Sequence, residues 1–331
     1  MIGQSEALRR VLTMIEKVAR YDEPLLIEGE TGTGKELAAR AVHYESERRN
    51  LPFVPANCGA VPDALLENEF FGHRKGAYTD ARRDAPGLLR LAHGGTLFLD
   101  EVDALSPRAQ VLLLRFIQDQ HFRPLGGHDE ERADVRIIAA SNQNLAELVR
   151  PGRFRLDLLF RLKVLYLWMP PLRDRAGDPE FLARHFVREL SRRYSLPEKM
   201  LHPATIAWFN GYSWPGNVRE LENLVRREFL LGEGTDLRIG DESVARSGAS
   251  EPAAATGLPY RLAKARAVAA FDRRFLDELL WRSGGNISVA AKLAGKERRA
   301  LGRLVKKYGI DLTELRAPHL PTGSDGLSLD A

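Results

Sequence analysis

The sequence has little cysteine and no long apolar run. One cysteine, Cys58, occurs among 331 residues, so no disulfide can form within the chain, and this fits a reducing compartment. The longest apolar stretch, at 164–172, is broken by two prolines and is far shorter than the roughly 20 residues of a membrane-spanning helix. The N-terminus also lacks the apolar stretch and cleavage site of a secretory signal. These absences predict a cytoplasmic chain with no membrane partner.

A strong excess of one charge is also absent. The 49 Lys and Arg residues against 45 Asp and Glu residues give a net charge of +4, which is too small to argue for a nucleic-acid partner by itself. The composition, at 44% hydrophobic residues, is that of an ordinary globular protein with room for two or three domains.

Five short apolar runs, at 24–29, 52–57, 95–101, 135–141 and 164–169, alternate with helical patterns. Such alternation predicts an α/β fold with a largely parallel sheet. We therefore expect an α/β unit at 1–172 and a helical unit at 173–243, where strand signals stop. A linker at 244–259, rich in small and polar residues, separates a second helical unit at 260–310, and a disordered tail follows at 311–331.

The segment "GETGTGKE" follows the first apolar run and opens a helix predicted from Leu37 to His43. This is the context of a P-loop, whose glycines let backbone amides curl around phosphates. Lys35 is predicted to reach the β- and γ-phosphates, although position 36 is Glu where the general motif has a magnesium-binding hydroxyl. The predicted nucleotide-binding residues are Gly29, Glu30, Thr31, Gly32, Thr33, Gly34, Lys35 and Glu36.

A second motif, "GGTLFLDE", ends an apolar strand on Asp100 and Glu101. Ligands of open α/β sheets bind at the carboxyl ends of the strands. We therefore expect Asp100 to hold Mg²⁺ and Glu101 to polarise the water that attacks ATP. Acidic capping of an exposed strand end is the simpler alternative, and the P-loop upstream argues against it.

Six motifs together resemble the AAA+ ATPases, and within them the bacterial enhancer-binding activators of sigma-54 RNA polymerase. They are "GETGTGKE", "FFGHRKGAYTDA", "GGTLFLDE", "FRLDLLFRL", "WPGNVRELEN" and "GNISVAAKLAG", and the resemblance covers nearly all of residues 2–310. It implies an AAA+ P-loop ATPase with a parallel sheet and a helical lid subdomain, plus a C-terminal all-α helix-turn-helix domain of the Fis type. Glu after the P-loop lysine is usual in that family.

The resemblance also implies roles for residues outside the P-loop. Asn57 would hold Glu101 in an inactive pose until the nucleotide state changes, and Asn142 would be the polar sensor after the next strand. Arg155 and Arg161 resemble arginine fingers that reach the nucleotide of a neighbouring subunit, which requires a ring, in this family a homohexamer. Either arginine can instead be a surface cation. Arg219 resembles the lid residue that senses nucleotide in its own subunit, on a helix that we expect Asn217 to cap.

The segment "GAYTDA" corresponds to a "GAFTGA" loop with which the family contacts sigma-54. Its members here are Gly76, Ala77, Tyr78, Thr79, Asp80 and Ala81. Tyr in place of Phe keeps the flat ring, whereas Asp80 in place of Gly adds a charge. Three interpretations are open. The loop works, with Asp80 neutralised by Lys75, Arg82 or Arg83 or capping the next helix; the loop is weakened for a particular partner; or it no longer engages sigma-54. We favour the working loop, because the ATPase motifs are complete.

The C-terminal helical unit resembles a Fis-type helix-turn-helix. "NISVAAKLAG" predicts a short helix capped by Asn286 and ending at Gly295, and a basic helix follows. We expect the second helix to enter the major groove, although a solvated basic face would show a similar pattern. Gly302 within it weakens the helix by about 1 kcal/mol. The predicted DNA-binding residues are Arg298, Arg299, Arg303, Lys306 and Lys307.

The motifs together predict an activator that binds upstream, enhancer-like DNA and uses ATP and Mg²⁺ to remodel the closed complex of sigma-54 RNA polymerase into the open complex. The alternative, which Asp80 favours, is a nucleotide-modulated DNA-binding regulator that does not engage sigma-54. A general AAA+ remodeller of another protein is a third possibility. The chain begins almost directly at the ATPase motifs, without a sensory domain, so we expect control by a separate regulatory protein or by expression level.

Overall fold

The computed structural model of the chain describes residues 1–60, 63–78, 81–232, 234–246, 276, 279–280, 283, 286–295 and 298–307. These residues fall into two units, one within 1–249 and the other within 250–331. Among the helices described, none is both long and apolar enough to cross a membrane.

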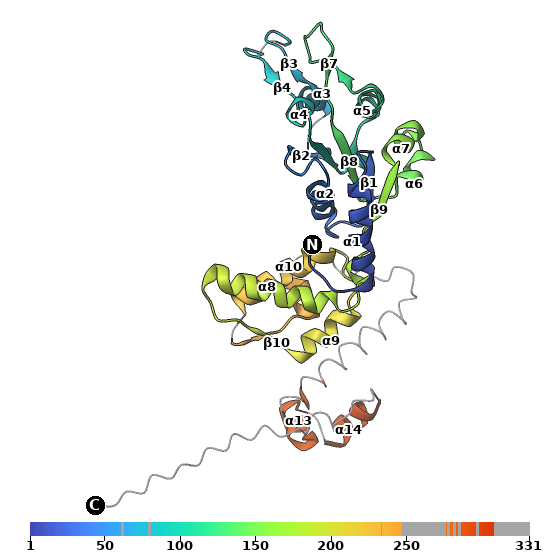
Figure 1. The fold of residues 1–331 in the computed structure, drawn as a ribbon. Coiled ribbons are helices and arrows are strands. Elements are labelled where there is room, and N and C mark those ends of the chain that lie inside the picture. The colour runs from blue at the N-terminus through green and yellow to red at the C-terminus, as the bar shows by residue number, and fades with distance from the viewer. Residues whose placement is uncertain are drawn as a thin grey trace, which may run out of the picture. The chain divides into compact units, whose positions relative to one another are not determined.

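A five-stranded parallel sheet forms the centre of the first unit (Figure 1). Each of the five apolar runs forms one strand, so the prediction of a parallel α/β sheet is confirmed. Strands in the middle of the sheet are buried on both faces, which explains why they read as unbroken apolar runs. In spatial order the strands are β2 (Phe53–Asn57), β5 (Thr96–Asp100), β8 (Arg136–Ser141), β1 (Leu25–Glu28) and β9 (Leu165–Trp168).

Helices cover both faces of this sheet and bury two separate apolar clusters against it. Neighbouring strand residues point to opposite faces, so Leu25 and Ile27 join one cluster and Leu26 joins the other. One face is covered by α1 (Glu6–Ala19) and α2 (Lys35–Tyr44). The other cluster includes residues of α3 (Asp63–Phe71), α4 (Leu88–Leu91), α5 (Pro107–Asp119), α6 (Leu145–Val149) and α7 (Leu156–Leu162).

Two short antiparallel hairpins extend from this α/β layer structure. The first joins β3 (Gly72–His73) to β4 (Ala85–Pro86), and the second joins β6 (His121–Phe122) to β7 (Glu131–Arg132). An isolated bridge between His73 and Leu125 connects the two hairpins. The sequence analysis did not predict them, because two-residue strands leave no alternating pattern to detect.

The lid is built mainly from α8 (Asp178–Tyr194), α9 (Pro203–Gly211), α10 (Asn217–Leu231) and α11 (Asp241–Arg246). Trp214 is fully buried in its core, between Phe209 and Tyr212. A parallel pair, β10 (Met200–Leu201) with β11 (Asp236–Leu237), also belongs to the lid. The expectation that strands stop before the lid is therefore wrong in this detail. Two short 3₁₀ turns complete this unit, η1 (Val102–Ala104) after β5 and η2 (Leu172–Asp174) before the lid.

The start of α1 is bonded directly to the lid through the fully buried carboxylate of Asp178. Its Oδ1 accepts hydrogen bonds from the amides of Gln4 at 2.7 Å and Ser5 at 2.9 Å. Its Oδ2 accepts from the Ser5 hydroxyl at 2.9 Å and from Arg175 Nε at 2.8 Å. One carboxylate therefore joins the N-terminal segment to the first turn of α8.

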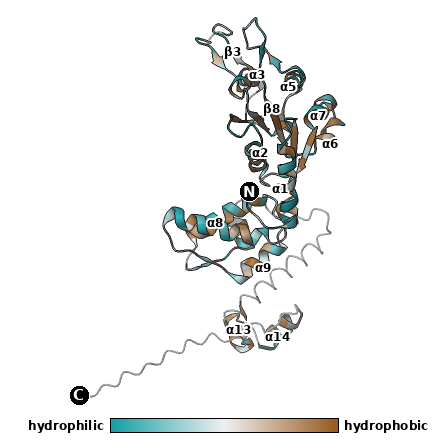
Figure 2. Ribbon diagram, viewed as in Figure 1, coloured by the Kyte–Doolittle hydropathy of each residue, from teal (hydrophilic) through white to brown (hydrophobic). Residues whose placement is uncertain are grey.

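The second unit contains α13 (Ile287–Leu293) and α14 (Arg298–Lys307). Asn286 caps α13, as predicted, by accepting hydrogen bonds from the amides of Ser288 at 3.0 Å and Val289 at 3.3 Å. A small apolar core forms from Leu276, Leu279, Leu280, Ala290, Ala291, Leu301 and Val305. Figure 2 shows the contrast between units: the strands of the large sheet are brown, whereas α14 carries teal, hydrophilic residues beside its apolar ones.

Candidate functional site

The P-loop joins the end of β1 to α2, as the sequence predicts. Gly34 precedes α2 with a left-handed φ of 97°, a conformation that favours glycine. The loop is closed by its own bonds, since both the amide and the hydroxyl of Thr33 donate to the carbonyl of Glu30, at 3.4 Å and 2.8 Å. The helix begins at Lys35, two residues before the predicted start. This arrangement points the N-terminus of a ten-residue helix at the site.

Lys35 is almost completely buried beneath the loop. Its Nζ donates to the carbonyls of Gly29 at 2.7 Å and Glu30 at 3.1 Å, and also to Oδ1 of Asn142. Burial lowers the pKa of Lys35, although the nearby carboxylates, Asp100 first among them, oppose that shift. The ammonium group is therefore held in place by acceptors of the protein before any phosphate is present.

Of the two predicted carboxylates, Asp100 is the last residue of β5 and Glu101 follows it directly. Burial raises the pKa of Asp100, while the amide of Glu101 (3.0 Å from Asp100 Oδ1) and the charge of Lys35 oppose the shift. Glu101 has a left-handed backbone with φ of 54°, which is unusual for a residue other than glycine and recurs at active sites. This backbone turns its carboxylate toward Asn142, whose Nδ2 lies 3.4 Å from Glu101 Oε1.

Asn57 lies beside Asp100 in the pairing of β2 with β5. Its side-chain oxygen accepts hydrogen bonds from the amides of Gly59 at 2.8 Å and Ala60 at 3.0 Å. The position that a Cβ would take on Gly59 lies 2.6 Å from Glu101 Oε2 and 3.4 Å from Asn57 Oδ1. Asn57 and Glu101 thus approach the same glycine from two strands.

Asp103 is a functional candidate that the sequence analysis missed. Its Oδ1 accepts hydrogen bonds from the Ser141 hydroxyl at 2.9 Å and from the amide of Asn142 at 3.3 Å, and its Oδ2 accepts from Gln143 Nε2 at 3.0 Å. These bonds tie the turn after β5 to the turn after β8. Asp103 therefore fixes Asn142, which contacts both Lys35 and Glu101. Its place three residues after Asp100 was the only signal in the sequence.

The lid closes one side of the same site. Arg219 lies on the first turn of α10, and the position that a Cβ would take on Gly32 lies 3.1 Å from Arg219 Cβ. The P-loop, the two carboxylates, Asn142 and the lid enclose a pocket of about 240 Å³. It is lined by Thr31, Gly32, Gly34, Lys35, Glu36, Leu37, Asp100, Glu101, Asn142, Val218, Arg219 and Glu222.

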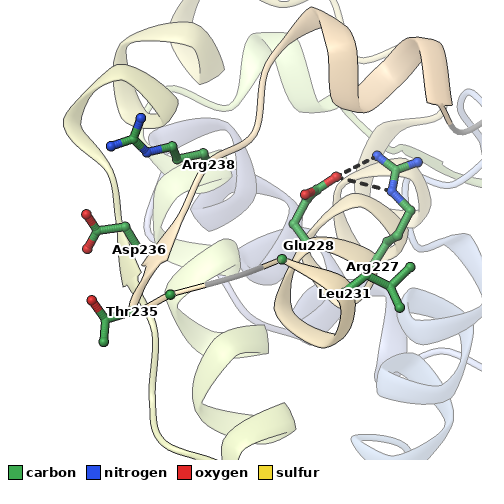
Figure 3. A pocket seen from close by; sticks show the side chains of 8 residues that line it. Arg227, Glu228, Leu231, Thr235, Asp236 and Arg238 are labelled. Atoms are coloured by element: carbon green, nitrogen blue, oxygen red, sulfur yellow. Dashed lines mark hydrogen bonds and ion pairs between the residues drawn. The ribbon is translucent and has the colours of Figure 1, made fainter. Parts of the chain in front are cut away.

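A larger pocket, of about 1030 Å³, lies at the other end of α10 (Figure 3). Its charged lining contains two arginines and two acids, and Arg227 bonds to Glu228 at 3.1 Å. It has neither a loop of backbone amides at a helix N-terminus nor a strand end with paired carboxylates. The smaller pocket is therefore the candidate nucleotide site.

Arg155 and Arg161 do not line this pocket. Arg155 precedes α7, where its guanidinium binds Asp157 at 2.7 Å, and both groups are close to half exposed. Arg161 is exposed in the last turn of the same helix. Two large apolar side chains of α7 are also exposed, Leu156 at 51% and Phe160 at 69%. The structure thus places both arginines on an accessible helix beside apolar surface.

The predicted contact loop lies in the β3–β4 hairpin. Gly76 has a φ of 86°, its amide donates to the carbonyl of Ala81 at 2.8 Å, and Tyr78 is 46% exposed. Asp84 closes the base of the loop by accepting from the amide of Lys75 at 2.8 Å and from Arg74 at 2.9 Å. These two hydrogen bonds lower the pKa of Asp84, and the bond from the amide of Lys75 contributes most.

Thr79 and Asp80 lie outside the described residues. Of the cations expected to neutralise Asp80, Lys75, Arg82 and Arg83 all have exposed side chains. The nearby Arg74 is already bonded to two acids, to Asp84 and to Glu131 at 2.7 Å. The prediction that Asp80 is compensated therefore stays a prediction.

Comparison with known proteins gives the family. The family model of the sigma-54 interaction domain matches residues 1–168, and that of the AAA+ ATPase lid domain matches residues 173–252. The response regulator protein PilR of Pseudomonas aeruginosa is 40% identical over 94% of this chain and 70% of its own length. The chain belongs to the sigma-54-dependent transcriptional activators.

Three further similarities agree with this family. The transcriptional regulator NtrC of Salmonella typhimurium is 38% identical over 94% of the chain and 70% of its own length, whereas the nitrogen fixation protein AnfA of Azotobacter vinelandii is covered over only 57% of its length. The structure of NtrX from Brucella abortus in complex with ATP matches with a TM-score of 0.67 and 34% identity, over 94% of this chain and 69% of that one. The AAA+ P-loop fold predicted from the sequence is thereby confirmed.

In the activator's second unit, α14 carries the predicted DNA-binding residues. Arg298, Arg299 and Arg303 are exposed. Lys306 and Lys307 lie at the end of the same helix, and their side chains are outside what the structure describes. Leu301 and Val305 face the small core, so α14 has one apolar and one basic side. Two helices with a basic outer side are what a helix-turn-helix requires, and the assignment of a DNA-binding domain stays a prediction.

One local prediction about the activator is wrong. Asn217 was expected to cap α10, but Gly216 is the capping residue and Asn217 is the first residue of the helix, with a φ of 52°. No side chain caps α10 in the predicted way, and Glu220 Oε2 instead accepts from the amide of Gly216 itself, at 2.8 Å. The side chain of Asn217 is fully buried and bonds to the P-loop instead.

Proposed function

We propose that the chain is an ATPase that binds upstream DNA and remodels the closed complex of sigma-54 RNA polymerase into the open complex. The observation that carries this proposal is the pocket in which Lys35, Asp100, Glu101, Asn142 and Arg219 meet. A cation beneath a P-loop, a strand-end carboxylate pair and a polar sensor are the parts that phosphoryl transfer to water requires.

Each of these groups has a role that follows from its surroundings. Lys35 donates to two loop carbonyls and to Asn142, and it would reach the terminal phosphates by exchanging one of these three bonds for a phosphate oxygen. Glu101 is placed to accept a proton from the attacking water, and Asn142 to hold that carboxylate against the phosphate end of the site. Asn57, which lies beside Glu101 at Gly59, would restrain Glu101 when no hydrolysis is required.

Asp100 is the candidate magnesium ligand. It is a partly desolvated carboxylate with an oxygen donor, and oxygen donors are what Mg²⁺ prefers. When bound, Mg²⁺ neutralises charge that develops on the phosphates. Among the described residues, no three His, Cys, Asp or Glu side chains gather into a metal-ligand set. Phosphate oxygens and water would therefore supply the remaining ligands. Glu36, which replaces the usual hydroxyl, is paired with Arg40 at 2.8 Å.

Hydrolysis would take place between subunits of a homohexameric ring. Arg155 and Arg161 lie outside the pocket of their own subunit and are accessible, which fits a role at a neighbouring subunit's phosphates. The exposed Leu156 and Phe160 on the same helix provide apolar area for such a contact.

The loop around Tyr78 would carry the motion to sigma-54, and the basic face of α14 would hold upstream DNA. Arg298, Arg299 and Arg303 are placed to meet bases or phosphates, and Lys306 and Lys307 to meet phosphates. Asp80 is the one observation that favours a second function, that of a nucleotide-modulated DNA-binding regulator without contact to sigma-54.

Trapping the protein with ADP and a metal-fluoride mimic of the transition state, and measuring its binding to purified sigma-54, tests the proposal. We expect binding by the wild type, and none without nucleotide. Asp80→Gly serves as the matched variant. Binding gained only by Asp80→Gly would establish the second function. No binding by either protein, with ATP turnover intact, would refute the sigma-54 assignment.

A further inference from the structure

The lid is fastened to the P-loop by contacts that the ATPase motifs do not explain. The amide of Val218 donates to the carbonyl of Gly32 at 3.0 Å, and the position that a Cβ would take on Gly32 lies 2.3 Å from the carbonyl oxygen of Gly216. Only glycine at position 32 permits this approach, so the lid and the P-loop meet backbone to backbone. Such a contact fixes where Arg219 lies relative to the P-loop.

Asn217 lies at the centre of this contact. Its Oδ1 accepts from the amide of Leu172, in the segment that leads into the lid, at 2.7 Å. Its Nδ2 donates to the carbonyl of Thr31 at 3.0 Å and to Glu30 Oε2 at 3.1 Å. Glu30 in turn forms a two-bonded ion pair with Arg173, also in that entering segment. One amide therefore bonds to the P-loop and to the segment entering the lid.

Asn217 also has a left-handed backbone, with φ of 52°, and its side chain is fully buried. A non-glycine residue in this conformation costs about 1–2 kcal/mol. Asparagine is among the residues that tolerate the conformation best. The chain thus turns sharply at Asn217, and Arg219 follows two residues later on the same helical turn. Asn217 is buried and strained and does not cap α10. Its hydrogen bonds explain this strain if they position α10.

We propose that Asn217 is a positioning residue, which locks the lid onto the P-loop so that Arg219 faces the nucleotide phosphates. The inference rests on the proposed ATPase function. The P-loop also has internal bonds of its own, through Thr33 and Lys35, that do not involve Asn217. Loss of the Asn217 bonds should therefore release the lid and act through Arg219.

Asn217→Asp is the sharpest test of this role. Aspartate has the same size and also tolerates a left-handed backbone, and it can still accept the bond from Leu172. It replaces the amide donor with an oxygen that faces Glu30 and the carbonyl of Thr31. We expect the dissociation constant of a fluorescent ADP analogue, mant-ADP, to rise about tenfold.

Two comparisons separate positioning from general destabilisation. In an Arg219→Ala background, Asn217→Asp should weaken mant-ADP binding by less than about twofold, because residues that act together are not additive. Thr205→Val is the matched control within the lid. Thr205 is buried and bonds to Ile239 at 2.9 Å and Leu237 at 3.2 Å, away from the P-loop. This control should lower the melting temperature and leave the dissociation constant unchanged.

Each outcome of the mant-ADP experiment either supports the positioning role of Asn217 or overturns it. No mant-ADP binding by the wild type would overturn the proposed ATPase function, and this inference with it. Wild-type binding that Asn217→Asp leaves within twofold, or a loss that simply adds to that of Arg219→Ala, would overturn the inference alone. Should Asn217→Asp fail to fold, Asn217→Gly tolerates the left-handed backbone and removes every side-chain bond of Asn217. It should weaken mant-ADP binding about tenfold, again only while Arg219 is present, and binding within about twofold of the wild type would overturn the inference.

Discussion

Replacing Asp178 by Asn should destabilise the activator strongly, although the two side chains have the same shape. The carboxylate is fully buried and accepts four hydrogen bonds, from Gln4, from the amide and hydroxyl of Ser5, and from Arg175. An asparagine has one oxygen and one NH₂ group, so one orientation leaves the amides of Gln4 and Ser5 facing a donor and the other leaves Arg175 Nε facing one. Each unpaired buried donor costs about 1–3 kcal/mol.

Arg175 adds to this cost, because its guanidinium is 3% exposed and would lose its buried counter-charge. Breaking a buried ion pair from one side costs about 3–5 kcal/mol. These estimates describe overlapping losses, so we take about 3–5 kcal/mol for the whole substitution. For a unit of this size, each 1 kcal/mol shifts the melting temperature by about 2–4 °C. The expected fall is therefore about 10 °C.

Thermal unfolding followed by far-ultraviolet circular dichroism measures this shift. Glu180→Gln is the matched control, because it removes a charge from the same helix at a partly exposed pair with Arg184. Such pairs contribute about 0.2–1 kcal/mol. If the melting temperature of Asp178→Asn lies within about 2 °C of that of Glu180→Gln, the two substitutions differ by no more than about 1 kcal/mol. That result would refute the reasoning about the buried carboxylate.

The pH dependence gives a second check on Asp178. Burial by itself raises the pKa of this group, but the bonds from Gln4, Arg175 and Ser5 outweigh it and leave the pKa below its usual value. A group with a depressed folded pKa stabilises the protein above its unfolded pKa, about 3.9 for Asp. The difference in melting temperature between the wild type and Asp178→Asn should be full at neutral pH. It should shrink as the pH falls below about 4.

Three further predictions concern function. Glu101→Gln should abolish ATP turnover while mant-ADP binding persists, and normal turnover in a phosphate-release assay would remove Glu101 from the site. Asp84→Asn should speed amide hydrogen exchange at Lys75 and reduce capture of sigma-54 without lowering the ATPase rate, whereas unchanged exchange would show that Asp84 does not hold the loop. Asn286→Ala should cost the second unit about 1 kcal/mol by removing the cap of α13. DNA binding in a titration should weaken accordingly, and a variant that binds DNA like the wild type would argue that α13 does not support α14.

The candidate nucleotide site was largely predictable because its parts are local in sequence. A P-loop is specified by glycines at a strand-to-helix turn, and Asp100 and Glu101 by their place at a strand end. The parallel sheet then brings the carboxyl ends of β1, β5 and β8 to one edge. The two short hairpins and the β10–β11 pair were not predictable, because strands of two residues have no periodicity.

The sequence by itself determined the five strands of the large sheet, the P-loop, the carboxylate pair at the end of β5 and the cap of α13, since each depends on residues within a few positions of one another. Tertiary structure alone decided which partners Asn217, Asp178 and Asp103 would find. Asn217 reaches Glu30 across 187 positions, and Asp178 reaches Ser5 across 173. Helical periodicity shows which face of an element is buried. It does not show which distant loop that face meets, because that depends on how the lid packs against the sheet.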